Sequence, residues 1–204
     1  MKYFDISYCQ TNKAISDIMS KNADGVIIRN GYKNTTDTMF NTHIKNAIKA
    51  NVPAIGSYIF FMATNYNEAK AEAENAISRL APYKSAINAP IFLDFEDLRA
   101  GCGKNITFNT DLLMYEMRLL KDAGYNVGIY TNHNYILNYI DLSRIMCNNY
   151  LQADLWLADY RSVPYNPIYP VSMWQYGTET INGVKYDANY CYVDYARRAL
   201  TFGD

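Results

Sequence analysis

Short apolar runs alternate with amphipathic segments of helical period along the first 150 residues of the chain. The runs are bounded by polar, Gly or Pro residues and have the length of strands. They predict strands at Lys2–Ile6, Gly25–Arg29, Ala54–Phe61, Ile91–Glu96 and Val127–Thr131. The segments between them predict helices at Lys13–Lys21, Asp37–Ala50, Asn67–Leu80 and Asn109–Ala123, with a short helix around Tyr135–Tyr139. This order is that of consecutive βα units.

The alternation of strand-like and helix-like segments ends after residue 150. Strands are predicted at Leu155–Ala158, Val171–Tyr176 and Tyr186–Tyr195, and the loops that join them are rich in Pro, Asn and Gly. Five βα units followed by three strands predict an α/β fold, an irregular TIM-like barrel of parallel strands with few or no helices in its last part. Because no linker or composition break divides the chain, we expect one barrel domain over residues 1–204.

An acidic pair ends the fourth predicted strand, in the run Pro90-Ile91-Phe92-Leu93-Asp94-Phe95-Glu96-Asp97. In a strand, Asp94 and Glu96 lie on the same face, with Cα atoms roughly 6.5 Å apart, while Phe95 points to the other face. Two adjacent carboxylates repel each other, so at least one should have a raised pKa, as a proton donor near neutral pH requires. The structural alternative is a strand that runs into a solvated acidic turn.

The barrel gives these acids a common place, because its active site lies at the carboxyl ends of the strands. Asp5 ends the first strand and Asp187 lies in the last, so we expect both beside the acidic pair. Four more residues are predicted at or near the same end: Arg29, Tyr130, Trp156 and Trp174. Four carboxylates with several aromatic faces are typical of a groove that cleaves saccharides.

Composition narrows the function further. The net charge is −1, from 19 basic and 20 acidic residues that form no runs, which argues against a nucleic-acid partner or an anionic membrane surface. The chain has two histidines and four scattered cysteines, so neither a metal site nor a Ser-His-Asp triad is expected, and we predict no cofactor. The cysteines are expected to be free and mostly buried.

An ordered set of motifs then covers nearly the whole chain. It consists of Phe4-Asp5-Ile6-Ser7, Gly25-Val26-Ile27-Ile28-Arg29-Asn30-Gly31-Tyr32, Gly56-Ser57-Tyr58-Ile59-Phe60, Leu93-Asp94-Phe95-Glu96, Gly128-Ile129-Tyr130-Thr131-Asn132, Leu155-Trp156-Leu157-Ala158, Met173-Trp174-Gln175-Tyr176 and Asp187-Ala188-Asn189. In this set the chain resembles the family 25 glycoside hydrolases, the Chalaropsis-type lysozymes of bacteria and phage endolysins. The resemblance implies an N-acetylmuramidase that cuts the β-1,4 bond between N-acetylmuramic acid and N-acetylglucosamine in peptidoglycan.

The resemblance also implies roles for matching residues. Glu96 corresponds to the general acid, and Asp94 to the group that stabilises positive charge or orients the 2-acetamido group. Asp5 and Asp187 correspond to the flanking carboxylates. The sugar-binding groove is implied at Tyr58, Phe60, Tyr130 and Trp156.

Two departures from the family pattern affect these roles. The last acid usually follows Val, but here the order is Lys185-Tyr186-Asp187-Ala188-Asn189, so Asp194 remains a rival to Asp187. Ile59 replaces a histidine that many relatives carry, which changes groove contacts without removing the acid.

Three routes are possible for the stereochemistry of bond cleavage. Carboxyl groups about 5–5.5 Å apart imply nucleophilic retention and about 6.5–9.5 Å imply inversion, while retention assisted by the acetamido group is the third route and the one we expect.

A chitinase-like glycosidase, a non-catalytic saccharide-binding barrel and a divalent-metal hydrolase are the alternatives to the muramidase. Activity that survives EDTA would dispose of the last.

The resemblance extends to the biological setting. The N-terminus shows no signal peptide, and no apolar stretch is long enough to cross a membrane. We therefore expect an endolysin made in the cytoplasm of a bacterial host that acts on the wall after holin-dependent release or lysis. Many relatives carry a C-terminal wall-binding module, so we expect the chain to be either a catalytic fragment of a longer endolysin or a single-domain enzyme, and self-association is not indicated either way.

Overall fold

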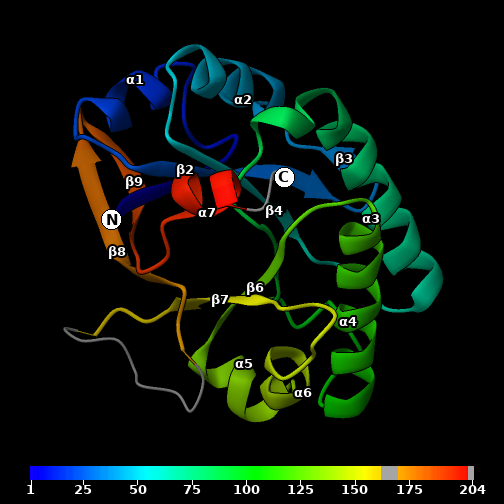
Figure 1. The fold of residues 1–204 in the computed structure, drawn as a ribbon. Coiled ribbons are helices and arrows are strands. Elements are labelled where there is room, and N and C mark those ends of the chain that lie inside the picture. Colours follow the sequence, from blue (N-terminus) through cyan, green and yellow to red (C-terminus); the bar gives the residue numbers. More distant parts are fainter. Residues whose placement is uncertain (162–169, 202–204) are drawn as a thin grey trace.

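The computed structural model describes residues 1–161 and 170–201, and within them the strands form a closed α/β barrel (Figure 1). The strands are β1 (Lys2–Ile6), β2 (Gly25–Tyr32), β3 (Thr35–Thr36), β4 (Ala54–Phe60), β5 (Ile91–Asp94), β6 (Val127–Asn132), β7 (Asp154–Ala158), β8 (Met173–Ile181) and β9 (Val184–Cys191). Their order is β1-β9-β8-β7-β6-β5-β4-β2, and pairing of β1 with β2 closes the ring. β3 extends β2 as an outer hairpin.

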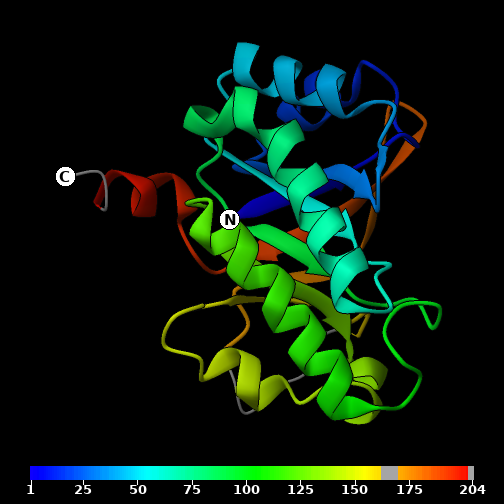
Figure 2. The same cartoon turned by 90° about the vertical axis from the view of Figure 1, so that its right-hand side faces the viewer.

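Helices cover the outside of the ring. They are α1 (Ala14–Met19), α2 (Phe40–Lys49), α3 (Tyr66–Leu80), the 3-10 helix η1 (Ala81–Ala86), α4 (Ile106–Asp122), α5 (His133–Asn138), α6 (Leu142–Met146) and α7 (Tyr195–Thr201). Figure 2 shows α3 and α4 side by side on this outer layer. α7 lies at the amino-terminal end of the barrel, where the ring of Tyr195 packs edge-on against Tyr3. No helix among the described residues has both the length and the apolar character to cross a bilayer.

The alternation of side chains along each strand produces two cores. Phe4, Val26 and Ile28 point outward under the helices. Tyr3, Ile27 and other side chains on the opposite face fill the barrel interior together with Phe92 and Trp156. Two glycines make room for the large interior rings, because a Cβ on Gly25 would lie 2.2 Å from Tyr3 and one on Gly128 would lie 2.5 Å from Phe92.

The structure corrects the predicted ends of several elements. The last strand, predicted at Tyr186–Tyr195, runs from Val184 to Cys191, and Tyr195 begins a helix. This strand is antiparallel to both neighbours, so the barrel is not wholly parallel. The cause is a tight turn at Asn182 and Gly183, whose φ angles of 50° and 82° are those of a hairpin.

Three other expectations also change. β5 ends at Asp94, so Glu96 lies just beyond the strand. β2 continues past Arg29 to Tyr32, because a register shift between Arg29 and Gly31 lets the chain turn into the β3 hairpin. The four cysteines are free, but only Cys191 is buried, since the other three lie outside the strands.

Two buried acids lie where α3 packs against α4. Both carboxyl oxygens of Glu116 on α4 are buried without a hydrogen-bond partner among the described residues. Burial raises the pKa of Glu116 well above its usual value, and the charge of Glu72 on α3 raises it further. Burial therefore favours the neutral form of Glu116 in the folded protein more than in the unfolded chain.

We expect the substitution Glu116→Met to raise the free energy of unfolding by about 1–3 kcal/mol at pH 8, because it removes a buried polar group that has no partner. The gain should shrink as the pH falls towards the unfolded pKa of about 4.3, since the cost of neutralising the carboxyl disappears there. Urea unfolding at several pH values measures both effects. A destabilised Met variant at pH 8 would contradict this account of the helix interface.

Candidate active site

A cavity of about 190 Å³ opens at the carboxyl ends of the parallel strands. Its acidic lining consists of Asp5, Asp94, Glu96 and Asp187, and the rest consists of Tyr58, Tyr130, Trp156, Tyr160 and Gln175. These residues come from seven barrel strands or the residues that follow them. Asp187 reaches this end because β9 is antiparallel, which places its first half opposite Asp5. The four acids expected from the sequence thus line one cavity.

The pair at the end of β5 occupies two different environments. Asp94 is 5% exposed, and its Oδ1 is buried without a hydrogen-bond partner in the described part of the chain. Burial raises the pKa of Asp94 well above its usual value, and the charges of Glu96 and Asp5 raise it further. Glu96 reaches solvent at the cavity mouth. Desolvation by surrounding protein atoms still raises its pKa, a hydrogen bond with Tyr130 opposes this, and the charge of Asp187 adds to it.

Asp5 is held by two amide groups. Its Oδ2 accepts hydrogen bonds from Nε2 of Gln175 at 3.0 Å and from Nδ2 of Asn189 at 2.8 Å. Burial raises the pKa of Asp5 to about 7, the negative charge of Asp187 adds to the shift, and the two amide bonds oppose it. Asp5 is therefore partly protonated near neutral pH.

A fixed donor sets the orientation of the Asn189 amide, and two hydroxyl groups contact the Gln175 amide. Oε1 of Gln175 accepts from the hydroxyl groups of Tyr130 at 3.0 Å and Tyr160 at 2.9 Å. Oδ1 of Asn189 accepts from Nε1 of Trp156 at 2.8 Å, and an indole nitrogen can only donate. Asn189 must then turn its NH₂ group towards Asp5, and Gln175 directs its own NH₂ group to the same carboxyl. Gln175, Asn189 and Tyr160 were not predicted as site residues, although the first two lie within quoted motifs.

The aromatic residues predicted for the groove lie in three places: in the lining of this cavity, outside it, and in a second cavity beside it. Tyr58, Tyr130 and Trp156 line the cavity, with the ring centroids of Tyr130 and Trp156 4.5 Å apart. Trp156 is only 2% exposed, so it supports the cavity floor and offers little ring surface to a ligand. Trp174 is outside this lining, where its Nε1 donates to the backbone oxygen of Asp159 at 2.6 Å.

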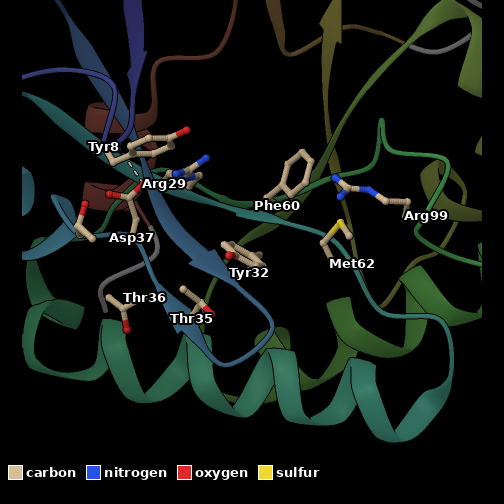
Figure 3. A pocket seen from close by; sticks show the side chains of 10 residues that line it. Tyr8, Arg29, Tyr32, Thr35, Thr36, Asp37, Phe60, Met62 and Arg99 are labelled. Carbon is tan, nitrogen blue, oxygen red and sulfur yellow. Dashed lines mark hydrogen bonds and ion pairs between the residues drawn. The ribbon is translucent and has the colours of Figure 1, made fainter.

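Arg29 and Phe60 line a second, larger cavity of about 390 Å³ next to the first (Figure 3). The register of the sheet makes the two cavities neighbours. Arg29 pairs with Tyr58, and Phe60 pairs with Asp94, so in each pair one residue lines each cavity.

Asp187 and its rival Asp194 lie in different places. Asp187 is half-buried in the first cavity, and desolvation raises its pKa. Asp194 is exposed at the start of α7, where its Oδ1 accepts a hydrogen bond from the backbone of Arg197 at 3.0 Å. Burial raises the pKa of Tyr3 and of Cys191 at the amino-terminal end of the barrel, and the charge of Asp194 adds to both shifts.

Comparisons with known proteins agree with this architecture. The profile of the glycosyl hydrolases family 25 matches residues 4–184. The modular autolysin LytC from Streptococcus pneumoniae, solved in complex with a synthetic peptidoglycan ligand, superposes with a TM-score of 0.76 at 25% identity. That match covers 92% of this chain but 46% of the autolysin, so the chain spans about half of its length.

Two endolysins share the fold at lower identity. The catalytic domain of endolysin ply40, from bacteriophage P40 of Listeria monocytogenes, has a TM-score of 0.74 at 21% identity, covering 98% of this chain and 96% of that domain. The CTP1L endolysin has a TM-score of 0.80 at 18% identity, covering 98% of this chain and 69% of its own. No curated protein shows significant sequence similarity to the chain.

Proposed function

The chain belongs to the glycosyl hydrolases family 25, and on this premise we propose that it is a peptidoglycan hydrolase, an N-acetylmuramidase (lysozyme) that cleaves the β-1,4 bond between N-acetylmuramic acid and N-acetylglucosamine. The observation that carries the proposal is the pair at the end of β5. Asp94 has a buried oxygen without a hydrogen-bond partner among the described residues, and Glu96 lies beside it at the mouth of the same cavity with a raised pKa. The peptidoglycan ligand solved with LytC supports the choice of substrate.

In this proposal Glu96 is the general acid. Its raised pKa favours the protonated carboxyl compared with an ordinary glutamic acid, and it donates this proton to the glycosidic oxygen as the bond to the anomeric carbon breaks. The carbonyl oxygen of the substrate's own 2-acetamido group attacks that carbon. The Glu96 carboxylate then takes a proton from the water that opens the intermediate, which gives overall retention.

Asp94 acts on the acetamido group. Its unpartnered Oδ1 can accept a hydrogen bond from the acetamido N–H and stabilise the positive charge that develops on the ring. Asp5 and Asp187 complete the acidic lining of the cavity, and the amides of Gln175 and Asn189 keep the Asp5 carboxyl in place. Tyr58 and Tyr130 shape the walls around the sugar.

Release of reducing sugar from purified peptidoglycan, compared with chitin, tests this function against the alternatives. We expect new reducing ends from peptidoglycan, little from chitin, and no loss of rate in EDTA. Preference for chitin would favour a chitinase-like glycosidase, and loss of activity in EDTA would favour a metal hydrolase. Binding of the glycan without cleavage would make the chain a saccharide-binding barrel.

The substitutions Asp187→Asn and Asp194→Asn distinguish the two rivals for the last acid. We expect Asp187→Asn to lower the hydrolysis rate by at least about tenfold, because it removes a charge from the cavity that holds the reacting sugar. Asp194→Asn should leave the rate within about twofold, because asparagine also caps a helix well. The opposite pattern in a steady-state assay would move the role to Asp194.

We further propose that the enzyme is made in a bacterial host and reaches the wall after holin-dependent release or lysis. The fold shared with two endolysins supports this setting.

A further inference from the structure

The second cavity, named here the arginine cavity, differs in chemistry from the acidic cavity beside it. Its lining includes Tyr8, Arg29, Tyr32, Phe60, Met62 and Arg99. Figure 3 shows the two guanidinium groups on opposite sides of the cavity, with Phe60 between them. Tyr8 and Tyr32 are 57% and 41% exposed, so part of each ring is accessible to a ligand.

The charged groups still open in this cavity are donors. Asp37, the acid in the lining, uses both oxygens: Oδ1 accepts from the backbone of Met39 at 2.8 Å, and Oδ2 accepts from the backbone of Tyr8 at 3.0 Å. The same Oδ2 accepts from Nε of Arg29 at 2.6 Å, and the ring of Tyr8 lies 4.5 Å from that guanidinium. In the described part of the chain, both Nη atoms of Arg29 are left without a hydrogen-bond partner.

Arg99 presents a similar edge from the other side. It binds Asp97 through Nε and Nη2, which leaves Nη1 without a partner among the described residues. The side chain of Arg99 is 74% exposed, so it can turn towards a ligand with little cost in packing. Two open guanidinium edges are suited to a carboxylate.

The walls of the arginine cavity are fixed by a buried acid behind them. Glu72 on α3 is 1% exposed and accepts hydrogen bonds from the backbone of Lys33 in the β2–β3 turn and from the backbone of Met62 at 3.1 Å. Arg79 adds a hydrogen bond from Nη1 to Oδ1 of Asn30 at 2.9 Å. Because α3 holds the hairpin and the end of β4 together, the cavity exists before a ligand binds.

We propose that the arginine cavity binds the carboxylate-bearing peptide branch of the muramyl substrate, with Arg29 and Arg99 as the donors. This inference rests on the proposed function. In peptidoglycan, the lactyl group of N-acetylmuramic acid carries a short peptide with free carboxylates and methyl side chains, whereas chitin has no such branch. The four acids of the first cavity would repel a carboxylate, so the adjoining arginine cavity is where the branch can lie while the sugar occupies the acidic one.

Binding to the inactive Glu96→Gln variant tests the proposal by calorimetry. The first probe is a tetrasaccharide of alternating N-acetylglucosamine and N-acetylmuramic acid that carries L-Ala-D-Glu on each muramic acid. The second is the same compound with its carboxyls converted to methyl amides. We expect the acidic probe to bind at least about tenfold more tightly, which is the effect of one charge-assisted contact.

Two further substitutions in that background assign the preference. Arg99→Met alters an exposed side chain and should not affect folding. Arg29→Lys keeps a cation beside Asp37 but removes the two Nη donors of the guanidinium group. Each should reduce the preference to less than about threefold. Arg118→Met, the same change of charge on the outer face of α4, should leave it unchanged.

Equal binding of the two probes, no binding of either, or a preference that survives both arginine substitutions would overturn the proposal. The proposed function is judged separately, by cleavage of peptidoglycan with the wild-type protein. Cleavage with no carboxylate preference would contradict the arginine cavity alone. A preference without cleavage would contradict the muramidase alone.

Discussion

Changing Glu96 to glutamine should lower the rate of peptidoglycan hydrolysis by about a hundredfold to ten-thousandfold, which is the range of a lost general acid. Glutamine has the same shape but no proton to give to the leaving oxygen. Because desolvation raises the pKa of Glu96, its ionised form slightly destabilises the fold, so the variant should melt at or above the wild-type temperature at pH 8. Turbidity loss of purified walls measures the rate, and thermal unfolding measures the fold.

Glu74→Gln is the matched control, since Glu74 is an exposed residue of α3 away from both cavities. It should leave the hydrolysis rate unchanged. Wall cleavage by the Glu96 variant within tenfold of the wild-type rate would remove Glu96 from the role of acid. A loss of rate accompanied by a lowered melting temperature would indicate damage to the barrel instead.

Changing Asp94 to asparagine should also lower the rate, by about a hundredfold or more, because an amide cannot stabilise the developing positive charge as a carboxylate does. Binding of the glycan should change much less than turnover, since the effect lies in the transition state. The steady-state kcat and KM on a soluble glycan separate the two. A variant that loses affinity but keeps its kcat would make Asp94 a binding residue only.

The same substitution has a stability signature with a definite sign. Burial raises the pKa of Asp94 above its unfolded value of about 3.9, so the wild-type protein loses stability as the pH rises from that value towards the folded pKa. Asparagine does not titrate, so its advantage over aspartate should grow between pH 4 and pH 8. A variant that is relatively weakest at pH 8 would mean that the ionised Asp94 is stabilised by partners.

The barrel could be predicted from the sequence because the spacing of apolar residues switches clearly between that of strands and that of helices. Apolar runs of strand length alternate with amphipathic helices, and this order allows few folds. The direction of β9 could also have been read, since Asn182-Gly183 between two strands is the common signal for a tight hairpin. It was missed because the parallel pattern of the first units was continued into the last one.

The four acids could be brought together from the sequence because strand ends meet at one end of a barrel. The amides around Asp5 could not, because their importance depends on which donors face them. Asn189 turns its NH₂ group to Asp5 because the indole of Trp156, on another strand, can only donate to its oxygen, and Gln175 is contacted by the hydroxyls of Tyr130 and Tyr160. The arginine cavity could not be predicted for a similar reason, because hydrogen bonds from two separate backbone segments to the buried Glu72 bring its walls together.

Mass spectrometry of the fragments released from purified peptidoglycan, before and after borohydride reduction, tests the central proposal most directly. The account predicts new fragments whose reducing end, and therefore the reduced sugar, is N-acetylmuramic acid, and it predicts that the Glu96→Gln variant releases at most about a hundredth as much in the same time. Fragments that end in reduced N-acetylglucosamine would contradict it and make the enzyme a glucosaminidase. Intact glycan strands after prolonged incubation would contradict hydrolysis of this polymer altogether.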